Sequence, residues 1–351
     1  MNPFNVIKYL PHLLRKKIYE KYIIIESDDW GLERAPNVDC VSFIEKKFGK
    51  KNLTRWSYDT LETKEDLNYL YDLLESYKNK FESPPVITAN FITHNIDYSN
   101  KEELKFLPIS KGFSNKDEDV RELYKKGIEE KYIFPQLHGF SHYNIEDLKN
   151  YFKTEEANEL FSWKFLTAKS TVRGNMSFLQ GELGKNHVGK YFKRAAEEFE
   201  RVFGFNSKTF IPPTYIYDFT LTDILKANNI GLVQSSNRLN PASEKNFLRP
   251  YFKKRKGLYW SVRNARLDPH PDYNFNHEQC LSTIQKMFEI KSPAIIDFHR
   301  VNFAGRFASD YRNKTLEELK KLFEGIHKKW PDVKFIHSQK FNDLLWQQEI
   351  R

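Results

Sequence analysis

A short apolar run near the N-terminus constrains the fold most strongly. Residues Tyr22 to Ile25 form a continuous, largely β-branched run, as expected of a strand covered on both faces in a parallel sheet. The sequence ESDDWG follows at 26–31. Because active sites of parallel α/β sheets and barrels lie beyond the carboxyl ends of the strands, Asp28 and Asp29 are candidate functional residues. Asp and Gly are also common in turns, so a plain strand-to-loop turn is the alternative.

Similar apolar runs recur along the chain, and amphipathic helical patterns separate them. Helices are expected at 38–48, 64–81, 117–130, 278–288 and 339–348, with Thr63 capping the second, and another is expected to open at a capping box of Thr315 and Glu318. Further strands are expected at 86–93, 132–137, 209–211, 231–234, 258–262, 294–298 and 333–336. This alternation predicts an α/β fold with a parallel sheet and right-handed crossovers, either open or closed into a barrel.

The 351 residues contain no internal repeat and no linker, so we expect a single domain spanning 1–351. A glycine-rich, polar segment at 167–189 predicts a loop insertion, either a lid over a site or a surface excursion.

The net charge of +9 arises from 56 basic and 47 acidic residues that are scattered along the expected helices. Such mixing is typical of a solvated surface. Only Arg249 to Lys256 resembles the basic and aromatic stripe of a nucleic-acid interface, so no nucleic-acid partner is expected.

The expected location is the cytoplasm. Cys40 and Cys280 form no metal or redox motif, which fits a reducing compartment. No signal peptide is recognised and no apolar run reaches the length of a membrane span. A weak contact with a membrane surface through Leu10, Leu13 and Leu14 is the alternative. The sequence does not indicate the oligomeric state.

A pair of histidines, His138 and His142, follows the expected strand at 132–137. On one helical turn, a spacing of four residues would allow both imidazoles to bind a single metal ion. The zinc proteases place a Glu directly after the first His, but Gly139 stands here, which excludes that class. A metal site built on this pair would need one carboxylate as a ligand and another as a base, and Asp28 and Asp29 could supply both. Solvent-facing or capping histidines are the alternative.

The order of these motifs resembles the polysaccharide deacetylases of the NodB type over most of the chain, from Tyr22 to Trp346. The motifs are a strand ending in SDDWG at 27–31, a strand at 88–93, His-x-x-x-His, Pro-Pro at 212–213 and a late strand ending in His299. By this resemblance, the Trp inside the first motif would place the chain in an uncharacterised branch of that family. The resemblance implies an incomplete (β/α) barrel of about seven strands with a divalent metal ion, usually zinc, in its mouth.

The resemblance also implies a role for each residue. Asp28 would be the general base, Asp29, His138 and His142 the metal ligands, and His299 the acid that protonates the leaving amine. These roles suit amide hydrolysis, which needs an activated water, a proton acceptor and a proton donor.

Substrate contacts are expected from three further residues. Trp30 and Tyr215 could stack on a sugar ring, with core packing as the alternative for each. A backbone N–H near Thr214 or Tyr215 could stabilise the oxyanion of the tetrahedral intermediate.

One position departs from the family pattern, because Ile211 stands before Pro-Pro where the family usually has an Arg that orients the base. Arg263 or Arg300 could substitute for that Arg. Asp268 could support His299, although an ordinary loop residue is the favoured alternative for Asp268. The expected function is metal-dependent removal of an acetyl group from an N- or O-acetylated sugar in a polysaccharide, oligosaccharide or glycan precursor. The alternative, favoured by the missing Arg, is an inactive carbohydrate-binding relative.

Overall fold

The computed structural model describes residues 17–99, 103–113, 119–165, 181–184, 187–236, 240–241, 251–270 and 273–347. Within these residues, a ten-stranded sheet forms the centre of the molecule. From edge to edge, it contains β10 (Lys254–Arg255), β11 (Leu258–Arg263), β8 (Leu232–Ser236), β6 (Thr209–Phe210), β5 (Ile133–Gly139), β2 (Ile87–Ile92), β1 (Tyr22–Trp30), β13 (Ala294–His299) and β12 (Ala265–Arg266), with β14 (Lys334–Phe335) beside the start of β1. All neighbours pair in parallel except β10 and β11. The predicted parallel α/β sheet is confirmed.

The sheet curls into an incomplete barrel because the chain passes almost directly from β11, near one edge of the sheet, to β12 at the other edge. β11 pairs with β8, whereas β12 pairs with β13 at the other end of the strand order, and only Asn264 separates β11 from β12. Asn264 fixes this junction: its backbone N–H donates to the Ile295 carbonyl at 3.0 Å, and its side-chain oxygen accepts the Ile295 N–H at 2.9 Å. The carboxyl ends of distant strands therefore converge at one mouth.

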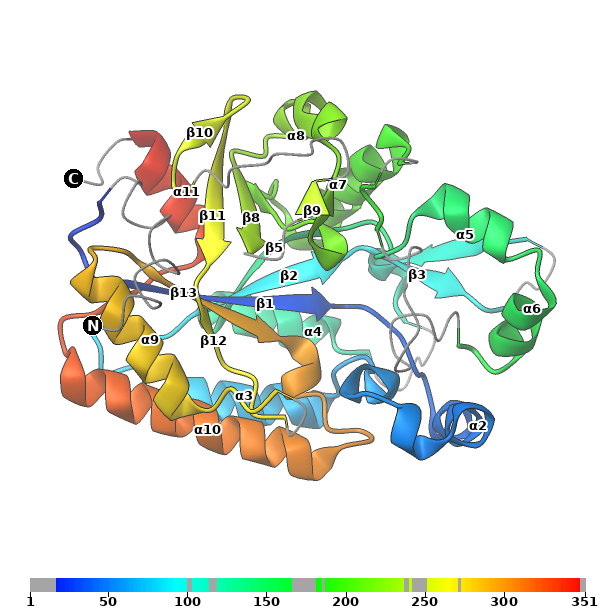
Figure 1. Ribbon diagram of the computed structural model, residues 1–351, viewed down its shortest axis with the longest axis horizontal. Helices are drawn as coiled ribbons and strands as arrows, with labels where there is room; N and C mark the ends of the chain where they lie inside the picture. Colours follow the sequence, from blue (N-terminus) through cyan, green and yellow to red (C-terminus); the bar gives the residue numbers. More distant parts are fainter. Residues whose placement is uncertain are drawn as a thin grey trace, which may run out of the picture.

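Helices cover the sheet on two sides. They are α2 (Val38–Phe48), α3 (Lys64–Glu75), α4 (Arg121–Glu129), α5 (Ile145–Tyr151), α6 (Glu155–Ser162), α7 (Gly189–Phe203), α8 (Thr222–Ala227), α9 (His277–Glu289), α10 (Ser309–Lys329) and α11 (Ser338–Gln347). In Figure 1, α3, α9 and α10 lie below the sheet and α7 and α8 lie above it, while α2, α5 and α6 surround the end toward which β1 points.

The described part of the chain also contains several short elements. Two small sheets pair β3 (His94–Asp97) with β4 (Lys105–Pro108) and β7 (Ile216–Tyr217) with β9 (Asn240–Pro241). The 3-10 turns are η1 (Lys50–Asn52), η2 (Arg55–Tyr58), η3 (Ile109–Lys111), η6 (Pro213–Tyr215), η7 (Phe219–Leu221) and η8 (Arg300–Asn302).

Local signals placed some helix ends correctly and others wrongly. Thr63 caps α3 through the Asp66 N–H at 3.1 Å, as expected, but the helix ends at Glu75 rather than near residue 81. The capping box expected at Thr315 is wrong, because α10 already begins at Ser309. Glu318 instead accepts the backbone N–H of His277 at 2.9 Å, so a tertiary contact outweighs the local motif.

β1 is the central strand, with β13 on one side and β2 on the other. It does not stop before the acids, as the sequence suggested, but continues through them to Trp30. The register with β2 shifts between Ser27 and Trp30, and Asp29 adopts a φ of 70°. This irregularity breaks the alternation of side chains, so that both Asp28 and Asp29 face the same pocket.

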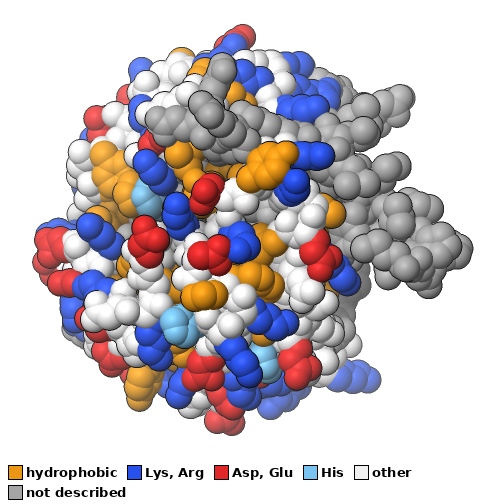
Figure 2. Space-filling model, turned by 90° about the vertical axis from the view of Figure 1, so that its left-hand side faces the viewer, with side chains coloured by type: hydrophobic (Ala, Val, Ile, Leu, Met, Phe, Trp, Pro, Cys, Tyr) orange, Lys and Arg blue, Asp and Glu red, His pale blue; other side chains and the backbone are white. Residues whose placement is uncertain are grey.

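Several expectations fall on residues outside the described part of the chain. They concern the proposed membrane contact at Leu10, Leu13 and Leu14 and most of the insertion expected at 167–189. Within the described residues, no helix combines the length and apolar character needed to cross a bilayer. Figure 2 shows a face on which Lys and Arg side chains are interspersed with Asp and Glu, which differs from the basic stripe of a nucleic-acid interface.

Buried neutral histidines predict that the protein loses stability in mild acid. Burial, with a smaller contribution from the charges of Arg194 and Arg201, lowers the pKa of His94 to about 3. The unfolded chain binds a proton near pH 6.5 and the folded chain only near pH 3, so acid favours unfolding. For this single group, the free energy of unfolding should fall by about 1.4 kcal/mol per pH unit between about pH 6 and 4.

Denaturant titrations of the wild type and of His94→Gln at several pH values test this expectation. The variant should show a shallower dependence on pH by about that slope. Parallel curves for the two proteins would contradict it.

Candidate functional site

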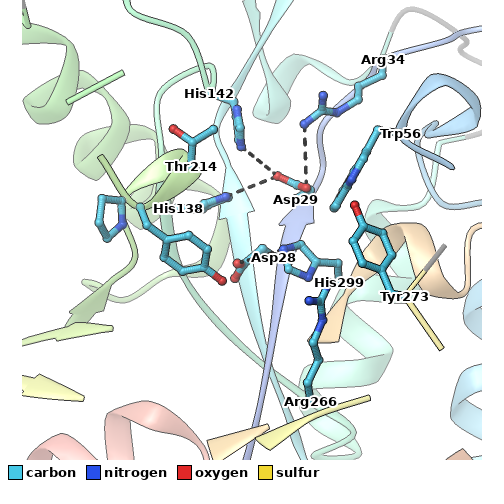
Figure 3. Close-up of a pocket in the computed structure, with 12 residues that line it drawn as sticks. Asp28, Asp29, Arg34, Trp56, His138, His142, Thr214, Arg266, Tyr273 and His299 are labelled. Atoms are coloured by element: carbon cyan, nitrogen blue, oxygen red, sulfur yellow. Dashed lines mark ion pairs between the residues drawn. The ribbon is translucent and has the colours of Figure 1, made fainter. Parts of the chain in front are cut away.

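A pocket of about 270 Å³ opens where the strands converge. Its walls combine acids, histidines, arginines and aromatic side chains from segments far apart in the sequence. They are Asp28, Asp29, Arg34, Trp56, His138, His142, Pro212, Thr214, Tyr215, Arg266, Tyr273 and His299. Figure 3 shows the two acids and His299 near the centre, with His138, His142 and Thr214 on one side, Arg34, Trp56 and Tyr273 on the other, and Arg266 below His299.

Three side chains converge on one point in this pocket. Asp29 Oδ1 lies 3.3 Å from His138 Nε2 and 3.2 Å from His142 Nε2 (Figure 3). All three residues are at least 96% buried. When a tetrahedral zinc ion holds ligands at about 2.0–2.1 Å, neighbouring ligand atoms lie about 3.3–3.4 Å apart, so this spacing fits such an ion.

The hydrogen bond of His138 supports the same interpretation. Its Nδ1 lies 2.9 Å from the carbonyl oxygen of Ile211, which can only accept, so Nδ1 carries the proton. In the neutral ring, Nε2 then points a lone pair at an oxygen of Asp29 that also carries lone pairs. A cation between the two atoms would turn this repulsion into attraction, and a backbone carbonyl behind a ligating histidine is a common arrangement in metal sites.

Electrostatics also favour a positive charge at this point. Burial opposes ionisation of Asp29, but His142, His138 and Arg34 outweigh it and hold its pKa well below the usual value. Contacts with Asp29 and Asp28 raise the pKa of His138 despite burial. Burial lowers the pKa of His142 to about 4, which keeps its ring neutral, the form that binds metal.

The two histidines converge without a helical turn, at the end of a strand as the sequence indicated. His138 lies in β5, and His142 lies in a bend with a φ of 70°. The carboxylate of Glu182 holds this bend by accepting the N–H groups of Phe140, Ser141 and His142 at 2.7–3.0 Å.

Gly139 makes room for the Glu182 carboxylate. Its φ is 133°, and a Cβ on this residue would lie 2.7 Å from Glu182 Oε1. A glycine is therefore required between the two histidines, both for its backbone conformation and for the close approach of the acid.

Asp28 is held by Arg263 from β11, which supplies the guanidinium that Ile211 cannot. Arg263 Nη2 and Nη1 donate to the two oxygens of Asp28 at 2.6 and 2.7 Å, and the Asn90 amide donates to Oδ1 at 2.9 Å. Burial would raise the pKa of Asp28, but the charge and hydrogen bonds of Arg263 lower it overall. Asp28 is therefore an ionised, oriented carboxylate at neutral pH.

Arg300, the other residue considered for this role, lies elsewhere. It is fully buried and pairs with Asp59 at 2.7 Å and Glu62 at 3.1 Å. Asp59 also contacts Arg34 at 2.9 Å, and Arg34 lies 3.8 Å from Asp29. Arg300 thus supports Asp29 through a chain of ion pairs rather than Asp28.

His299 lies between two acids at the end of β13. Its Nε2 is 3.6 Å from Asp28 Oδ2, and its Nδ1 is 3.5 Å from Asp297 Oδ1. Burial lowers the pKa of His299 despite both acids. The suggested pairing of Asp268 with His299 is wrong. Asp268 pairs with Arg55 and with Arg266, while Asp297 lies beside His299.

The three expected substrate contacts have different surroundings. Trp30 does not line the pocket: its side chain is fully buried, packs on Phe91 and Phe303 and donates to Ser27 Oγ at 2.9 Å. It is a core residue rather than a platform for a sugar. Thr214 and Tyr215 do line the pocket.

The turn at Tyr215 uses the backbone N–H of this residue, one of the two N–H groups expected to bind an oxyanion. Thr214 and Tyr215 have φ values of 53° and 59°. The backbone N–H of Tyr215 donates to the Pro212 carbonyl at 2.9 Å, and its hydroxyl accepts from Arg263 at 3.1 Å. This N–H already has an acceptor within the turn.

Several pocket residues escaped the sequence interpretation. Trp56 lies in η2, outside every predicted helix or strand, and its ring stands edge-on to His299 with centroids 5.2 Å apart. Arg266 and Tyr273 reach the same wall from β12 and the segment before α9. An aromatic residue in a polar loop was the sequence signal that could have identified Trp56. No comparable signal pointed to Arg266.

Comparisons with known proteins give structural likenesses only. No protein-family model and no curated protein matches the sequence. The structure is similar to a 4-alpha-glucanotransferase from Thermococcus litoralis (9% identity, TM-score 0.48), covering 93% of this chain but only 40% of the glucanotransferase. It is also similar to a protein assigned as a polysaccharide deacetylase from Mycobacterium smegmatis (11% identity, TM-score 0.48, 96% and 93% covered). A third likeness is to a family 4 carbohydrate esterase from Streptomyces lividans in complex with acetate (8% identity, TM-score 0.39, 91% of each chain covered).

The role of Glu182 predicts that its carboxylate sets metal affinity without contacting the metal site directly. In Glu182→Gln, one oxygen that accepts backbone N–H groups becomes an NH₂ group, so the bend carrying His142 loses at least one hydrogen bond. The dissociation constant for zinc, measured by competition with a chelator, should rise about 10–100-fold. Glu197→Gln, an exposed change on α7, is the matched control. Equal zinc affinity in the two variants would show that the bend holds without Glu182.

Proposed function

We propose that the protein is a metal-dependent hydrolase that removes an acetyl group from an acetylated carbohydrate. One observation carries the proposal: three buried donor atoms of Asp29, His138 and His142 face a common point, and Asp28 and His299 line the same pocket. A ligand set, a base and an acid are thus available around one substrate-sized space.

The donor set favours zinc. Two imidazole nitrogens and one carboxylate oxygen match a catalytic zinc site with an open position. When bound, the metal would activate a water molecule and polarise the acetyl carbonyl.

Asp28 takes the proton of the attacking water. Arg263 and Asn90 fix the orientation of its carboxylate, and its lowered pKa keeps it ionised across the neutral range. A base of this kind gains its efficiency from position as well as from basicity.

His299 delivers a proton to the leaving group. Its Nε2 lies 3.6 Å from Asp28, so a neutral His299 can receive the proton that Asp28 collects and pass it on. Asp297, 3.5 Å from Nδ1, favours the orientation and the transient positive charge of the ring. An amine leaves readily only when it is protonated, so this transfer would complete amide hydrolysis.

The pocket walls suit a sugar. Trp56 is half-buried and Tyr273 is 39% exposed, and both rings line the cavity beside His299. Aromatic faces are suited to packing against the apolar face of a sugar ring. The motif order shared with NodB-type deacetylases supports the same substrate class.

The alternative of an inactive carbohydrate-binding relative rested on Ile211 in place of the family Arg. Since Arg263 contacts both oxygens of Asp28, that ground for the alternative is weaker, and we favour the active enzyme.

Metal analysis coupled to an acetate-release assay over acetylated glycans tests the proposal. Purified protein loaded with zinc should hold about one ion per chain and release acetate. Asp29→Ala should lose the metal, because one of three ligands is gone. Protein that cannot be loaded with zinc would refute the site, and loaded protein that releases no acetate from any acetylated glycan would favour the inactive relative.

Asp28→Asn separates the base from the ligands. The amide cannot accept the proton of water, so kcat should fall by about 10²–10⁴-fold while zinc content stays at the wild-type level. Asn90→Asp is not a suitable control because it adds a buried charge, so Glu197→Gln again serves. Loss of zinc together with activity in Asp28→Asn would show that Asp28 is a ligand instead.

A further inference from the structure

Arg266 lines one wall of the pocket and shares a single acid with Arg55, which is not itself a lining residue. Asp268 pairs with Arg55 and with Arg266, the second at 2.6 Å. Among the described residues, no other acid forms an ion pair with either of them. Counted over the described residues, this group of three side chains has one more positive than negative charge, in surroundings where water screens charge poorly.

The arrangement leaves guanidinium nitrogens available. Arg55 is 3% exposed, and its Nε and Nη2 atoms are buried without a hydrogen-bond partner. Arg266 Nε is buried without a partner as well. Buried donors of charged groups are seldom left unsatisfied, because each costs free energy, so these donors favour a polar or anionic partner beside them.

Aromatic rings hold the two guanidinium groups in place beside the pocket. Arg55 lies over Trp56 at 4.4 Å and over Tyr273 at 4.8 Å, and Arg266 lies over Tyr273 at 4.7 Å and over Phe275 at 4.7 Å. Arg266 itself lines the cavity, with 19% of its side chain exposed. The positive charges therefore lie against Trp56 and Tyr273, the rings that are proposed to contact the sugar.

The opposite part of the pocket is unfavourable for an anion. Asp28 and Asp29 lie there, and Figure 3 shows Arg266 and Tyr273 on the other side of His299. The other arginine of the pocket, Arg34, already pairs with Asp59 and lies beside Asp29. A substrate with its acetyl group at Asp29 could therefore place a negative group toward Arg266.

We infer that the pocket selects acetylated sugars that carry an anionic group, a carboxylate or a phosphate, which pairs with Arg266 in the field of Arg55. This inference rests on the proposed function for the position of the acetyl group. It assigns Arg266 as the residue that determines specificity, and it separates the expected substrates from neutral acetylated polymers.

Binding measured by isothermal titration calorimetry on zinc-loaded protein tests the inference. The first pair of probes is a tetrasaccharide of alternating N-acetylglucosamine and glucuronic acid and its neutral counterpart, tetra-N-acetylchitotetraose. The second pair is N-acetylglucosamine 1-phosphate and N-acetylglucosamine. In wild type at about 50 mM salt, the anionic member of at least one pair should bind about tenfold or more tightly. The pair that shows the preference identifies carboxylate or phosphate as the recognised group.

Substitution of Arg266 should abolish the preference. In Arg266→Gln the ratio of affinities should fall to within about twofold, whereas Arg201→Gln, which removes an exposed charge on α7, should keep the wild-type ratio. If Arg266→Gln does not fold, the salt dependence of wild type decides, because the preference should shrink toward unity at about 0.5 M salt. Equal affinities in both pairs, no measurable binding of either anionic probe, or an unchanged ratio in Arg266→Gln would overturn the inference.

Acetate release is assayed separately. A binding preference without acetate release would leave the anion site standing and refute the hydrolase. Acetate release without a binding preference would support the hydrolase and refute the anion site.

Discussion

The buried guanidinium of Arg263 is the contact on which the pocket depends. It is 3% exposed and donates to Glu26 at 2.8 Å, to Asp28 at 2.6 and 2.7 Å and to Asp297 at 2.9 Å. These acids belong to the central strands β1 and β13, so one cation from β11 compensates acids on the two neighbouring strands across the barrel. Without it, those carboxylates would be buried with little compensation, and breaking a buried pair of this kind costs about 3–5 kcal/mol.

The candidate metal site depends on backbone that is not regular strand or helix. Asp29 and His142 both have a φ of 70°, which is unusual for residues with a Cβ. Glu182 stabilises the bend at His142, while Arg34 and the ion pairs behind it stabilise Asp29. Strained backbone held by buried polar contacts is common at functional sites, where the geometry of a few side chains matters more than local stability.

The sequence predicted the strands and their parallel arrangement, because apolar runs followed by polar residues depend on local pattern alone. The grouping of His299 with Asp28, Asp29, His138 and His142 came from the resemblance to the NodB type, and all five residues line one pocket. It could not choose Arg263 over Arg300, since that choice depends on how the sheet curls at Asn264.

The errors have local causes. Trp30 was expected at the pocket, but the bulge at Asp29 turns the Trp30 ring into the core. Asp268 was suggested as the acid beside His299, whereas the register of β13 places Asp297 there.

X-ray absorption spectroscopy of the zinc-loaded protein tests whether Asp29, His138 and His142 hold the metal. The spectrum should show nitrogen and oxygen ligands at about 2.0–2.1 Å with the scattering pattern of two imidazoles. Sulfur ligands, or a shell without imidazole, would contradict this assignment.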